Sequence, residues 1–377
     1  MAGIKLIDTA FPPEFPAASC TNIPQGAIWH NNSGIGHIYE NLTFDHVWAG
    51  EFVNGLSYSV IRNNTVNDFG GIGLTGGTYS LMEGNVLTNG MSSIRGAGKY
   101  SVVRYNRIID SNRSSAVYCG NHADGIGPLF SPAAEPGGNQ YGWIYGNYIS
   151  NTVQGIFLEY NNNGTSHWTM HSNVLVGHYG AGGSGACAIC IDSAPDTKIY
   201  NNTIFGINGS QGWASGINIG YREGISIPSS NVRIKNNIMY SVSSNAPAIG
   251  VENVDYANGL ISDYNWFYLP NRATPFAYGQ SNFKTFSEWQ GLGFDLSSFN
   301  GIDPKLIDID GTDYNQINLQ LSASSRARDA GESLAEVGVD LNDTSRPQGP
   351  AWDIGAYEYV QGEDTTPPSA PTGLNIN

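Results

Sequence analysis

A short phrase of apolar and polar positions recurs along the chain. It consists of an apolar residue, one or two further positions, an asparagine and another β-branched or apolar residue, as in Ile61-Arg62-Asn63-Asn64-Thr65-Val66 and Ile234-Lys235-Asn236-Asn237-Ile238. The phrase asparagines are at positions 41, 64, 85, 106, 147, 173, 202, 237 and 265, so successive copies lie 23, 21, 21, 41, 26, 29, 35 and 28 residues apart. A phrase with a period of about 21 residues predicts a solenoid of stacked coils.

A second phrase follows the asparagine in each coil and begins with Gly or Ala before an apolar-x-apolar pattern. Its copies are Gly71–Thr75, Gly155–Glu159, Ala188–Asp192, Gly216–Gly220 and Ala248–Glu252. Such alternation, bounded by Gly and Asn, predicts short strands with Ile and Leu pointing inward. Asparagine tolerates left-handed backbone at a corner, and stacked asparagines hydrogen-bond along a ladder. The chain is therefore predicted to be all-β, a right-handed parallel β-helix (a single-stranded solenoid) with an asparagine ladder and long inserted loops.

The repeat predicts one long body followed by a linker. Residues 1–361 are expected to form the β-helix catalytic domain, with caps where the repeat dissolves around Phe283–Gln290 and in Arg328–Gly331 and Asp353–Glu358. Residues 362–377 are rich in Pro and Thr, which is typical of an extended linker. This linker resembles the lead-in to a fibronectin type III module, which implies a further module downstream.

Composition favours an extracellular protein that does not bind nucleic acid. Charged residues make up only 13% of the 377 residues, whereas Gly numbers 48 and Tyr 21. A formal charge of −15 provides no basic stripe for a nucleic-acid backbone. No apolar run is long enough for a membrane span. The Met1-Ala2-Gly3 start has no signal peptide and is typical of a trimmed expression product, so we still expect a secreted or cell-surface protein, and a monomer.

The four cysteines are too few for a disulfide scaffold. They are Cys20, Cys119, Cys187 and Cys190, and the last two fall within an apolar, strand-like run. Free cysteine is among the most frequently buried residue types. We therefore expect buried free thiols rather than a metal site.

Insertions in a solenoid mark its functional face. The 41-residue gap contains about one extra coil length and includes His122 and Asp124, and the next gaps insert His178, Tyr179, Tyr221, Arg222 and Glu223. Three successive coils are thus expected to raise walls beside one stretch of sheet. That stretch is the predicted cleft.

Acidic residues are the candidate catalysts in this cleft. Glu159 and Asp192 align in neighbouring coils, about 4.8 Å apart, and Asp124 lies on the insertion one coil earlier. A proton donor and a carboxylate about 5 Å apart, or about 6.5–9.5 Å apart, are what retaining and inverting glycosidases use. His122 would orient or protonate a carboxylate, or act as a base.

Each candidate residue has an alternative interpretation. Outward acids are often only solvated surface, and Asp124, Glu159 and Asp192 are also hard oxygen ligands for Ca²⁺, although no cofactor is required by the hydrolase interpretation. Glu252 aligns with the acidic column but lies beyond Gly220, where a structural role is favoured. The predicted substrate-binding residues are Arg95, Tyr118, Tyr160, Trp168, His178, Tyr179, Trp213, Tyr221, Arg222 and Glu223. About half of the aromatic residues near the cleft are expected to serve loop packing instead.

The repeated phrases and the closing segments give the chain a resemblance to secreted β-helix proteins of the pectate lyase-like superfamily. It is also similar to archaeal disaggregatases in its acidic β-helix and Thr-Pro-Pro linker. The resemblance implies a polysaccharide substrate. Because acids are abundant and Lys is absent from the predicted face, a glycoside hydrolase that acts within the polysaccharide chain is favoured. The alternatives are a lyase with His122 or Tyr160 as base, assisted by Arg95, Arg222 or Ca²⁺, and a non-catalytic adhesin.

Overall fold

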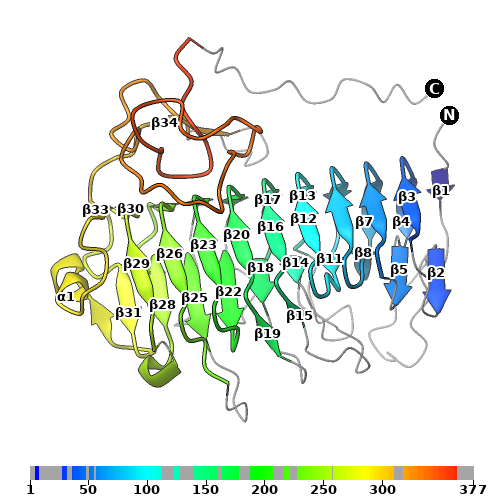
Figure 1. The fold of residues 1–377 in the computed structure, drawn as a ribbon, viewed down its shortest axis with the longest axis horizontal. Coiled ribbons are helices and arrows are strands. Elements are labelled where there is room, and N and C mark those ends of the chain that lie inside the picture. Colours follow the sequence, from blue (N-terminus) through cyan, green and yellow to red (C-terminus); the bar gives the residue numbers. More distant parts are fainter. Residues whose placement is uncertain are drawn as a thin grey trace.

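The computed structural model describes most of the chain. The described residues are 5–7, 28–31, 36–47, 51–54, 57–112, 123–127, 139–158, 164–177, 187–206, 215–220, 227–256, 258–309 and 317–362. They form a long stack of coils with a further segment folded against one side (Figure 1). The predicted linker after residue 362 lies outside the described residues.

Three long sheets run the length of the stack. Sheet 1 consists of β1 (Lys5–Ile7), β4 (Thr43–Val47), β7 (Thr65–Phe69), β10 (Val86–Thr88), β13 (Arg107–Ile109), β17 (Tyr148–Ser150), β21 (Val174–Val176), β24 (Thr203–Phe205), β27 (Ile238–Tyr240), β30 (Trp266–Tyr268) and β33 (Phe299–Asn300). Sheet 2 consists of β2 (Ile28–Asn31), β5 (Glu51–Asn54), β8 (Ile72–Thr75), β11 (Ser92–Arg95), β14 (Asp124–Gly127), β18 (Gln154–Leu158), β22 (Ile189–Asp192), β25 (Ile217–Gly220), β28 (Ile249–Val251), β31 (Phe276–Tyr278) and β32 (Phe283–Lys284). Sheet 3 consists of β3 (Ile38–Glu40), β6 (Val60–Arg62), β9 (Leu81–Glu83), β12 (Val102–Arg104), β16 (Trp143–Tyr145), β20 (Thr169–His171), β23 (Lys198–Tyr200), β26 (Arg233–Lys235) and β29 (Ile261–Asp263).

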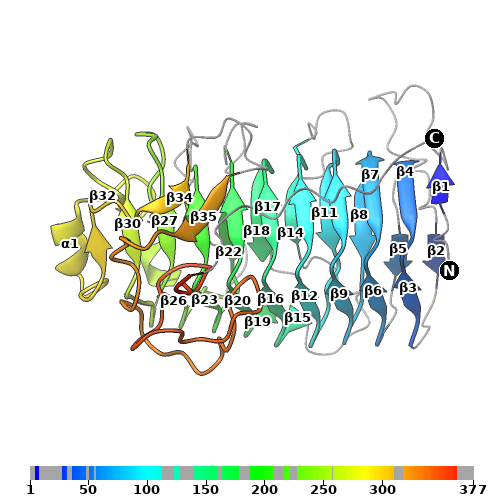
Figure 2. The same cartoon turned by 90° about the horizontal axis from the view of Figure 1, so that it is seen from above.

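Each coil contributes one strand to sheet 3, then sheet 1, then sheet 2, as Figure 2 shows from above. Strands of successive coils pair in parallel, so the connections between them are crossovers, and such crossovers are right-handed. The terminal strand β32 is the exception in sheet 2, since it pairs antiparallel with β31. The predicted right-handed parallel β-helix is therefore confirmed. Two small sheets lie outside this stack: β15 (Asn139–Gln140) with β19 (Thr165–Ser166), and β34 (Leu306–Asp308) with β35 (Asn318–Leu321).

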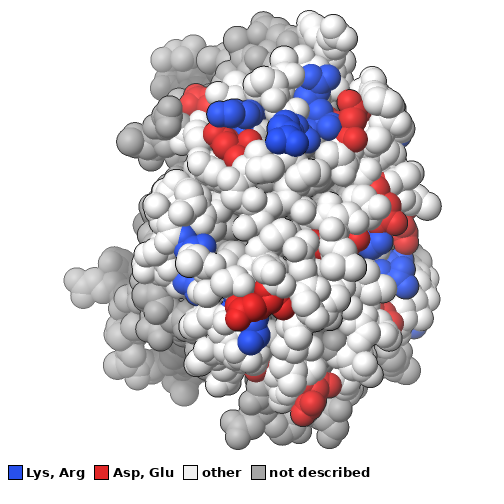
Figure 3. All heavy atoms as spheres, turned by 90° about the vertical axis from the view of Figure 1, so that its left-hand side faces the viewer, with Lys and Arg blue, Asp and Glu red and all other residues white. Residues whose placement is uncertain are grey.

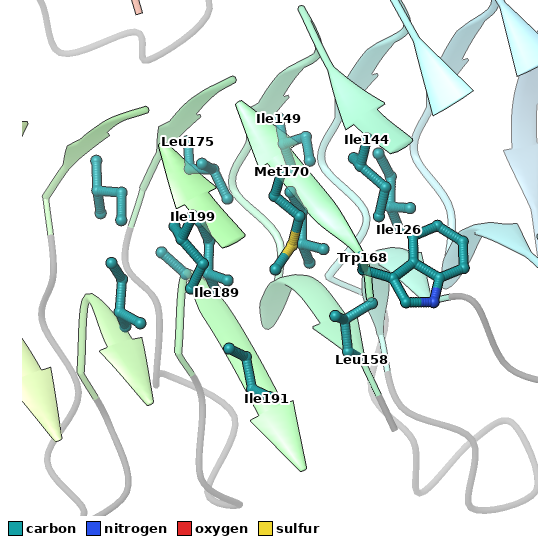
Figure 4. Packing of buried hydrophobic residues seen from close by; sticks show 14 of the residues in the cluster. Ile126, Ile144, Ile149, Leu158, Trp168, Met170, Leu175, Ile189, Ile191 and Ile199 are labelled. Carbon is teal, nitrogen blue, oxygen red and sulfur yellow. The ribbon is translucent and has the colours of Figure 1, made fainter. Parts of the chain in front are cut away.

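The inward columns of the coils build the core. Ile126 pairs with Ile156, and Ile156 pairs with Ile189, so identical side chains stack one coil apart. Figure 4 shows how isoleucines from all three sheets converge on Met170 and Leu175. The predicted alignment of the second phrase is confirmed from Gly155 onward. In the first copy it is wrong by two residues, because Leu74 and not Ile72 is in register with Ile94 and Ile126.

The asparagine ladder joins sheet 3 to sheet 1 at one corner. Its members are Asn64, Asn85, Asn106, Asn147, Asn173, Asn202, Asn237 and Asn265. Each Nδ2 donates to the Oδ1 of the next asparagine at 2.9–3.0 Å, and the same Oδ1 accepts the preceding asparagine's backbone N–H. Asn41 is not a member, since Leu42 occupies the ladder position in the first coil.

The left-handed residue at this corner is the one before each ladder asparagine. Asn63, Tyr105 and Asn201 have φ values of 54°, 54° and 48°. The ladder asparagines themselves do not have positive φ. The prediction that the asparagine side chains form a hydrogen-bonded ladder is therefore confirmed. The prediction that these asparagines adopt the left-handed backbone conformation is wrong, because the residue before each of them adopts it.

The C-terminal end of the stack is covered by residues 283–300. The short helix α1 (Phe286–Gln290) begins with a capping box in which Thr285 and Glu288 exchange hydrogen bonds. Its Trp289 is fully buried and stacks on Phe276 with ring centroids 4.8 Å apart. Seen from this end, the surface is mostly uncharged, with small groups of both signs (Figure 3). The predicted cap around Phe283–Gln290 is confirmed.

The last described segments, residues 302–309 and 317–359, lie along the side of the stack rather than over its end (Figure 1). Their Leu319, Ile354 and Ala356 are buried with the outward Val174, Ile238 and Trp266 of sheet 1. On sheet 3, Lys198 pairs with Glu336 at 2.6 Å, and Asn236 donates to the backbone oxygen of Glu332. The prediction that Arg328–Gly331 and Asp353–Glu358 close the solenoid is therefore wrong. The sequence pattern indicates that the coil repeat has ended, but it does not indicate which surface of the solenoid the following segment covers.

Removal of one ladder asparagine should strongly destabilise the fold. Asn147 donates to the backbone oxygens of Val103 and Tyr145 and to Asn173 Oδ1, and it accepts from Asn106. Asn147→Ala would leave several buried polar groups unpaired, so we expect a loss of about 3 kcal/mol or more in unfolding free energy, measured with a chemical denaturant. Asn300→Ala, at an exposed position, should change it by less than about 0.5 kcal/mol. Equal effects of the two substitutions would contradict the ladder's role.

A buried histidine beneath the C-terminal segment should make stability depend on pH. Burial, and secondarily Arg346, lowers the pKa of His171 to about 3. Below pH 6.5 the imidazole of His171 is protonated in the unfolded chain but stays neutral in the folded protein. The stability that comes from burying the neutral imidazole is therefore complete above pH 6.5 and is lost as the pH falls towards 3. Between pH 8 and pH 5 the wild type should lose about 2 kcal/mol relative to His171→Gln, measured as the difference in unfolding free energy. A difference that stays constant with pH would contradict this assignment.

Candidate active site

The outer face of sheet 2 carries two carboxylates in one column of aligned positions. Asp192 ends β22 and is paired with Gly220 of β25. Glu252 follows β28, and its backbone N–H donates to Ile219 at 3.0 Å, which continues the register of β25 and β28. Asp192 and Glu252 are both partly exposed. The two acids thus flank a buried glycine at the ends of three neighbouring strands, and the Oδ1 atom of Asp192 is itself buried.

Glycine at position 220 leaves room between these acids. A Cβ atom at Gly220 would lie 3.2 Å from Glu252 Oε1 and 3.4 Å from Asn218 Nδ2. Asn218 donates to Glu252 Oε1 at 2.5 Å, so the Glu252 carboxylate is held over the glycine and towards Asp192. An amide donor stabilises the ionised form of the carboxylate that accepts from it.

The spacing of the coils fixes the separation of the two acids. Their Cα atoms are two strand spacings apart, which amounts to about 9–10 Å. Because Glu252 leans over Gly220, its carboxyl group is closer to Asp192 than the Cα spacing alone requires. A carboxyl separation of about 6.5–9.5 Å accommodates a sugar and a water molecule in inverting glycosidases. The strand spacing thus places the two acids within reach of that range.

Asp124 has a different environment. It begins β14 instead of lying on an inserted loop, as the sequence predicted. Its side chain is fully buried, and its Oδ2 accepts from Arg95 Nη2 at 2.5 Å across to β11. The Arg95 side chain is only 7% exposed. Arg95 therefore neutralises a buried carboxylate and offers a substrate little accessible surface.

The structure does not bring Asp124 and Asp192 together. Asp124 lies two positions before Ile126, whereas Asp192 lies three positions after Ile189, and both isoleucines are in register through Ile156. The two acids are thus five positions apart along the strands and two coils apart, or on the order of 19 Å. That distance exceeds the separation of a glycosidase pair. The predicted cooperation of Asp124 with Asp192 is wrong because Asp124 begins its strand and Asp192 ends its own, so the two acids lie at opposite ends of the strands.

Cys187 and Cys190 form a disulfide on the same face. The prediction of buried free thiols is therefore wrong for this pair, although both residues are buried. They cluster with Phe157, and the register places Cys190 between Phe157 and Asn218. The disulfide thus joins Cys187, two residues before β22, to Cys190 within that strand, which ends at Asp192. Alternation within the strand predicted outward Cys190 but not its partner three residues earlier, because Cys187 precedes the strand.

Trp168 belongs to the core. Its side chain is fully buried, its Nε1 donates to the backbone oxygen of Asn139 at 3.0 Å, and Figure 4 shows it at the edge of the inner cluster. A buried indole has no face for a sugar, so the predicted substrate contact is wrong for Trp168. The remaining predicted site residues lie outside the described residues: Tyr118, His122, Glu159, Tyr160, His178, Tyr179, Trp213, Tyr221, Arg222 and Glu223. Their roles remain predictions.

The described part of the chain has neither a metal-binding cluster nor a membrane-spanning helix. No group of three or more His, Cys, Asp and Glu residues in it is arranged to hold a metal ion, and Ca²⁺ binding remains a prediction. None of its helices is long and apolar enough to cross a membrane.

Comparison with known proteins gives one named structural relative. No protein-family model matches the chain, and no curated protein matches it. Among solved structures, the chain is similar to one described as the crystal structure of pectate lyase Pel9A, with 14% identity, 89% of this chain and 84% of that chain covered, and a TM-score of 0.35. The parallel β-helix of this chain is established by its own strand pairing.

Asp124→Asn should reveal a structural role for the buried ion pair. Loss of the carboxylate charge leaves the Arg95 guanidinium buried without its counter-charge, which should lower the unfolding free energy by about 3–5 kcal/mol. The double variant Arg95→Met/Asp124→Asn should recover part of that loss because it removes the stranded cation. Denaturant unfolding measures both effects. An Asp124→Asn variant that is as stable as the wild type would contradict the structural role.

Proposed function

We propose that the chain is an extracellular glycoside hydrolase that cleaves within a polysaccharide, with Asp192 and Glu252 as its catalytic carboxylates. The observation that carries this proposal is the column Asp192–Gly220–Glu252, in which two partly exposed acids flank a glycine. Most other described residues of sheet 2 are buried, so Asp192 and Glu252 are among the few groups on it that a substrate can reach. Compared with the sequence prediction, Glu252 replaces Asp124 as a catalytic residue, and Asp192 is retained.

The hydrogen bond on Glu252 guides the assignment of roles. Asn218 donates to Glu252 Oε1, which favours the carboxylate form, and we assign Glu252 as the general base and Asp192 as the general acid. Glu252 takes a proton from water, and the water oxygen attacks the anomeric carbon. The bond from that carbon to the glycosidic oxygen breaks as Asp192 gives its proton to the leaving oxygen. The product would have inverted anomeric configuration.

Asp192→Asn and Glu252→Gln should each lower kcat by at least about 100-fold, since each removes one proton-transfer group. The measurement is the release of reducing ends from a panel of polysaccharides that gives activity with the wild type. Glu40→Gln, which removes an exposed acid on sheet 3, is the matched control and should retain activity.

Gly220→Ala should also lower activity because its Cβ enters the space between the acids, whereas Gly338→Ala, with open space at its Cβ, should not.

The same assays separate the other interpretations. Product configuration at the earliest time points, followed by NMR, should show inversion; retention would contradict the assigned pair. Absorbance near 232 nm would indicate an unsaturated product and a lyase. Absence of cleavage from every polysaccharide would favour the adhesin. Full activity in both Asp192→Asn and Glu252→Gln would show that the site lies elsewhere.

A further inference from the structure

A column of aromatic rings lies on the surface at the corner where sheet 2 turns into sheet 3. The rings belong to Tyr58, Tyr79, Tyr100, Tyr141 and His167, one from each of five successive coils. Their centroids are 4.7, 5.0, 5.3 and 4.6 Å apart. The four tyrosines are 41–53% exposed. Because the rings cover one another's faces, this aromatic column presents a regular row of ring edges and phenol groups.

The backbone at this corner does not favour tyrosine. All five residues of the aromatic column have φ between 57° and 60°, a left-handed conformation that is uncommon for bulky side chains. The same corner is occupied in other coils by Gly36, Asp196 and Asn231, which are residue types suited to that conformation. Backbone in a sparsely populated region costs about 1–3 kcal/mol, and stacking returns about 0.5–1.5 kcal/mol per pair. The corner therefore does not explain four exposed tyrosines in succession, which points to a ligand.

An apolar column runs beside the aromatic column on the outer face of sheet 3. Its members are in register and accessible at least in part: Ile38, Val60, Leu81, Val102 and Trp143. In the next outward column, Arg62 pairs with Glu40 at 2.6 Å, and Arg104 pairs with Glu83. Lys99 lies 5.2 Å from the ring centroid of Tyr100. These charges are engaged with one another or with a ring, so the surface suits an uncharged ligand.

The column has the periodicity of a linear polymer. It extends roughly 20 Å along the stack, at one coil rise per ring. The length of one pyranose residue in an extended chain is comparable with that rise, and pyranose rings offer apolar C–H faces together with hydroxyl groups. The apolar column provides a complementary surface for the C–H faces of the sugar rings, and the phenol groups provide hydrogen-bonding partners for the sugar hydroxyl groups.

We propose that the aromatic column and the adjacent apolar column bind an extended, uncharged polysaccharide along the axis of the β-helix. The column ends at His167, whose Nε2 lies 3.5 Å from Asp196 Oδ2, and Asp192 ends the sheet 2 strand of the coil that His167 begins. If the proposed function holds, this surface would retain the part of the polymer that extends beyond the cleaved bond.

The test is affinity electrophoresis through gels that contain hydroxyethylcellulose, galactomannan or arabinoxylan, with polygalacturonate as a charged comparison. The protein carries Asp192→Asn so that the polymer stays intact. At least one neutral polymer should retard it, and Tyr79→Asn/Tyr100→Asn should raise the Kd at least about tenfold, which corresponds to about 1.4 kcal/mol. Asparagine suits the left-handed backbone, so the double variant removes rings without straining the corner. Tyr264→Asn, at another left-handed corner with φ 56°, is the matched control and should bind like the parent.

Three results would overturn the proposal: retardation of the double variant equal to that of the parent, no retardation of the parent by any neutral polymer, or retardation by polygalacturonate alone. If the double variant unfolds, Tyr58→Asn at the end of the column provides the test, because it leaves the other rings stacked. It should weaken binding at least threefold, and unchanged binding would also overturn the proposal. Binding without cleavage by the Asp192-containing protein would refute the proposed hydrolase but leave this surface assigned. If the tyrosine variants cleave the polymer and bind it as tightly as the parent does, the proposed glycan surface would be refuted and the hydrolase proposal would stand.

Discussion

The asparagine ladder is the interaction on which the rest of the structure depends. At the corner between sheets 3 and 1 the backbone leaves the strand pattern, and its buried N–H and C=O groups need partners. Each ladder asparagine supplies them with one side chain, as Asn106 does for the backbone of Met82, Arg104 and Asn85. Because every rung bonds to the next, the register of one coil fixes the register of its neighbour. Insertions are accommodated elsewhere in the coil, so the 41-residue step from Asn106 to Asn147 leaves the ladder unbroken.

A fixed register turns sequence positions into columns, and the columns carry the chemistry. Two residues in the same column of adjacent coils are about 4.8 Å apart, whatever their separation in sequence. Asp192 and Glu252 are 60 residues apart in the chain, and they flank Gly220 because of this register. The aromatic column arises in the same way from residues at consecutive corners. A β-helix can therefore present both paired groups and repeating surfaces along one axis.

The C-terminal segment divides the outside of the stack into covered and open parts. Over the later coils it buries the outer face of sheet 1 and places Arg346 in a buried ion pair with Glu358 at 2.8 Å. Burial raises the pKa of Glu358 to about 7, against the opposing effect of Arg346, and lowers that of His171. The C-terminal segment reaches as far as the coil of β12, where the Tyr105 hydroxyl donates to Asp343 Oδ1 at 3.1 Å. The apolar column of sheet 3 stays at least partly exposed in that coil. The covering segment and the proposed glycan surface thus share coils but use different faces of them.

The sequence alone determined the solenoid, its ladder from Asn64 to Asn265 and the inward columns, because hydrophobic periodicity and a buried amide are local requirements that every coil repeats. It also identified Asp192 as an outward acid. It misplaced Asp124 and Trp168, since a side chain's burial depends on where an insertion enters the coil, and it gave no sign of the Cys187–Cys190 bond. It also aligned Glu252 with the acidic column but favoured a structural role for it. The stacking of the tyrosines at the left-handed corners follows from register between coils, and the C-terminal segment's position follows from the apolar patch that it covers. Those relations are distances between residues remote in sequence, so only the tertiary structure decided them.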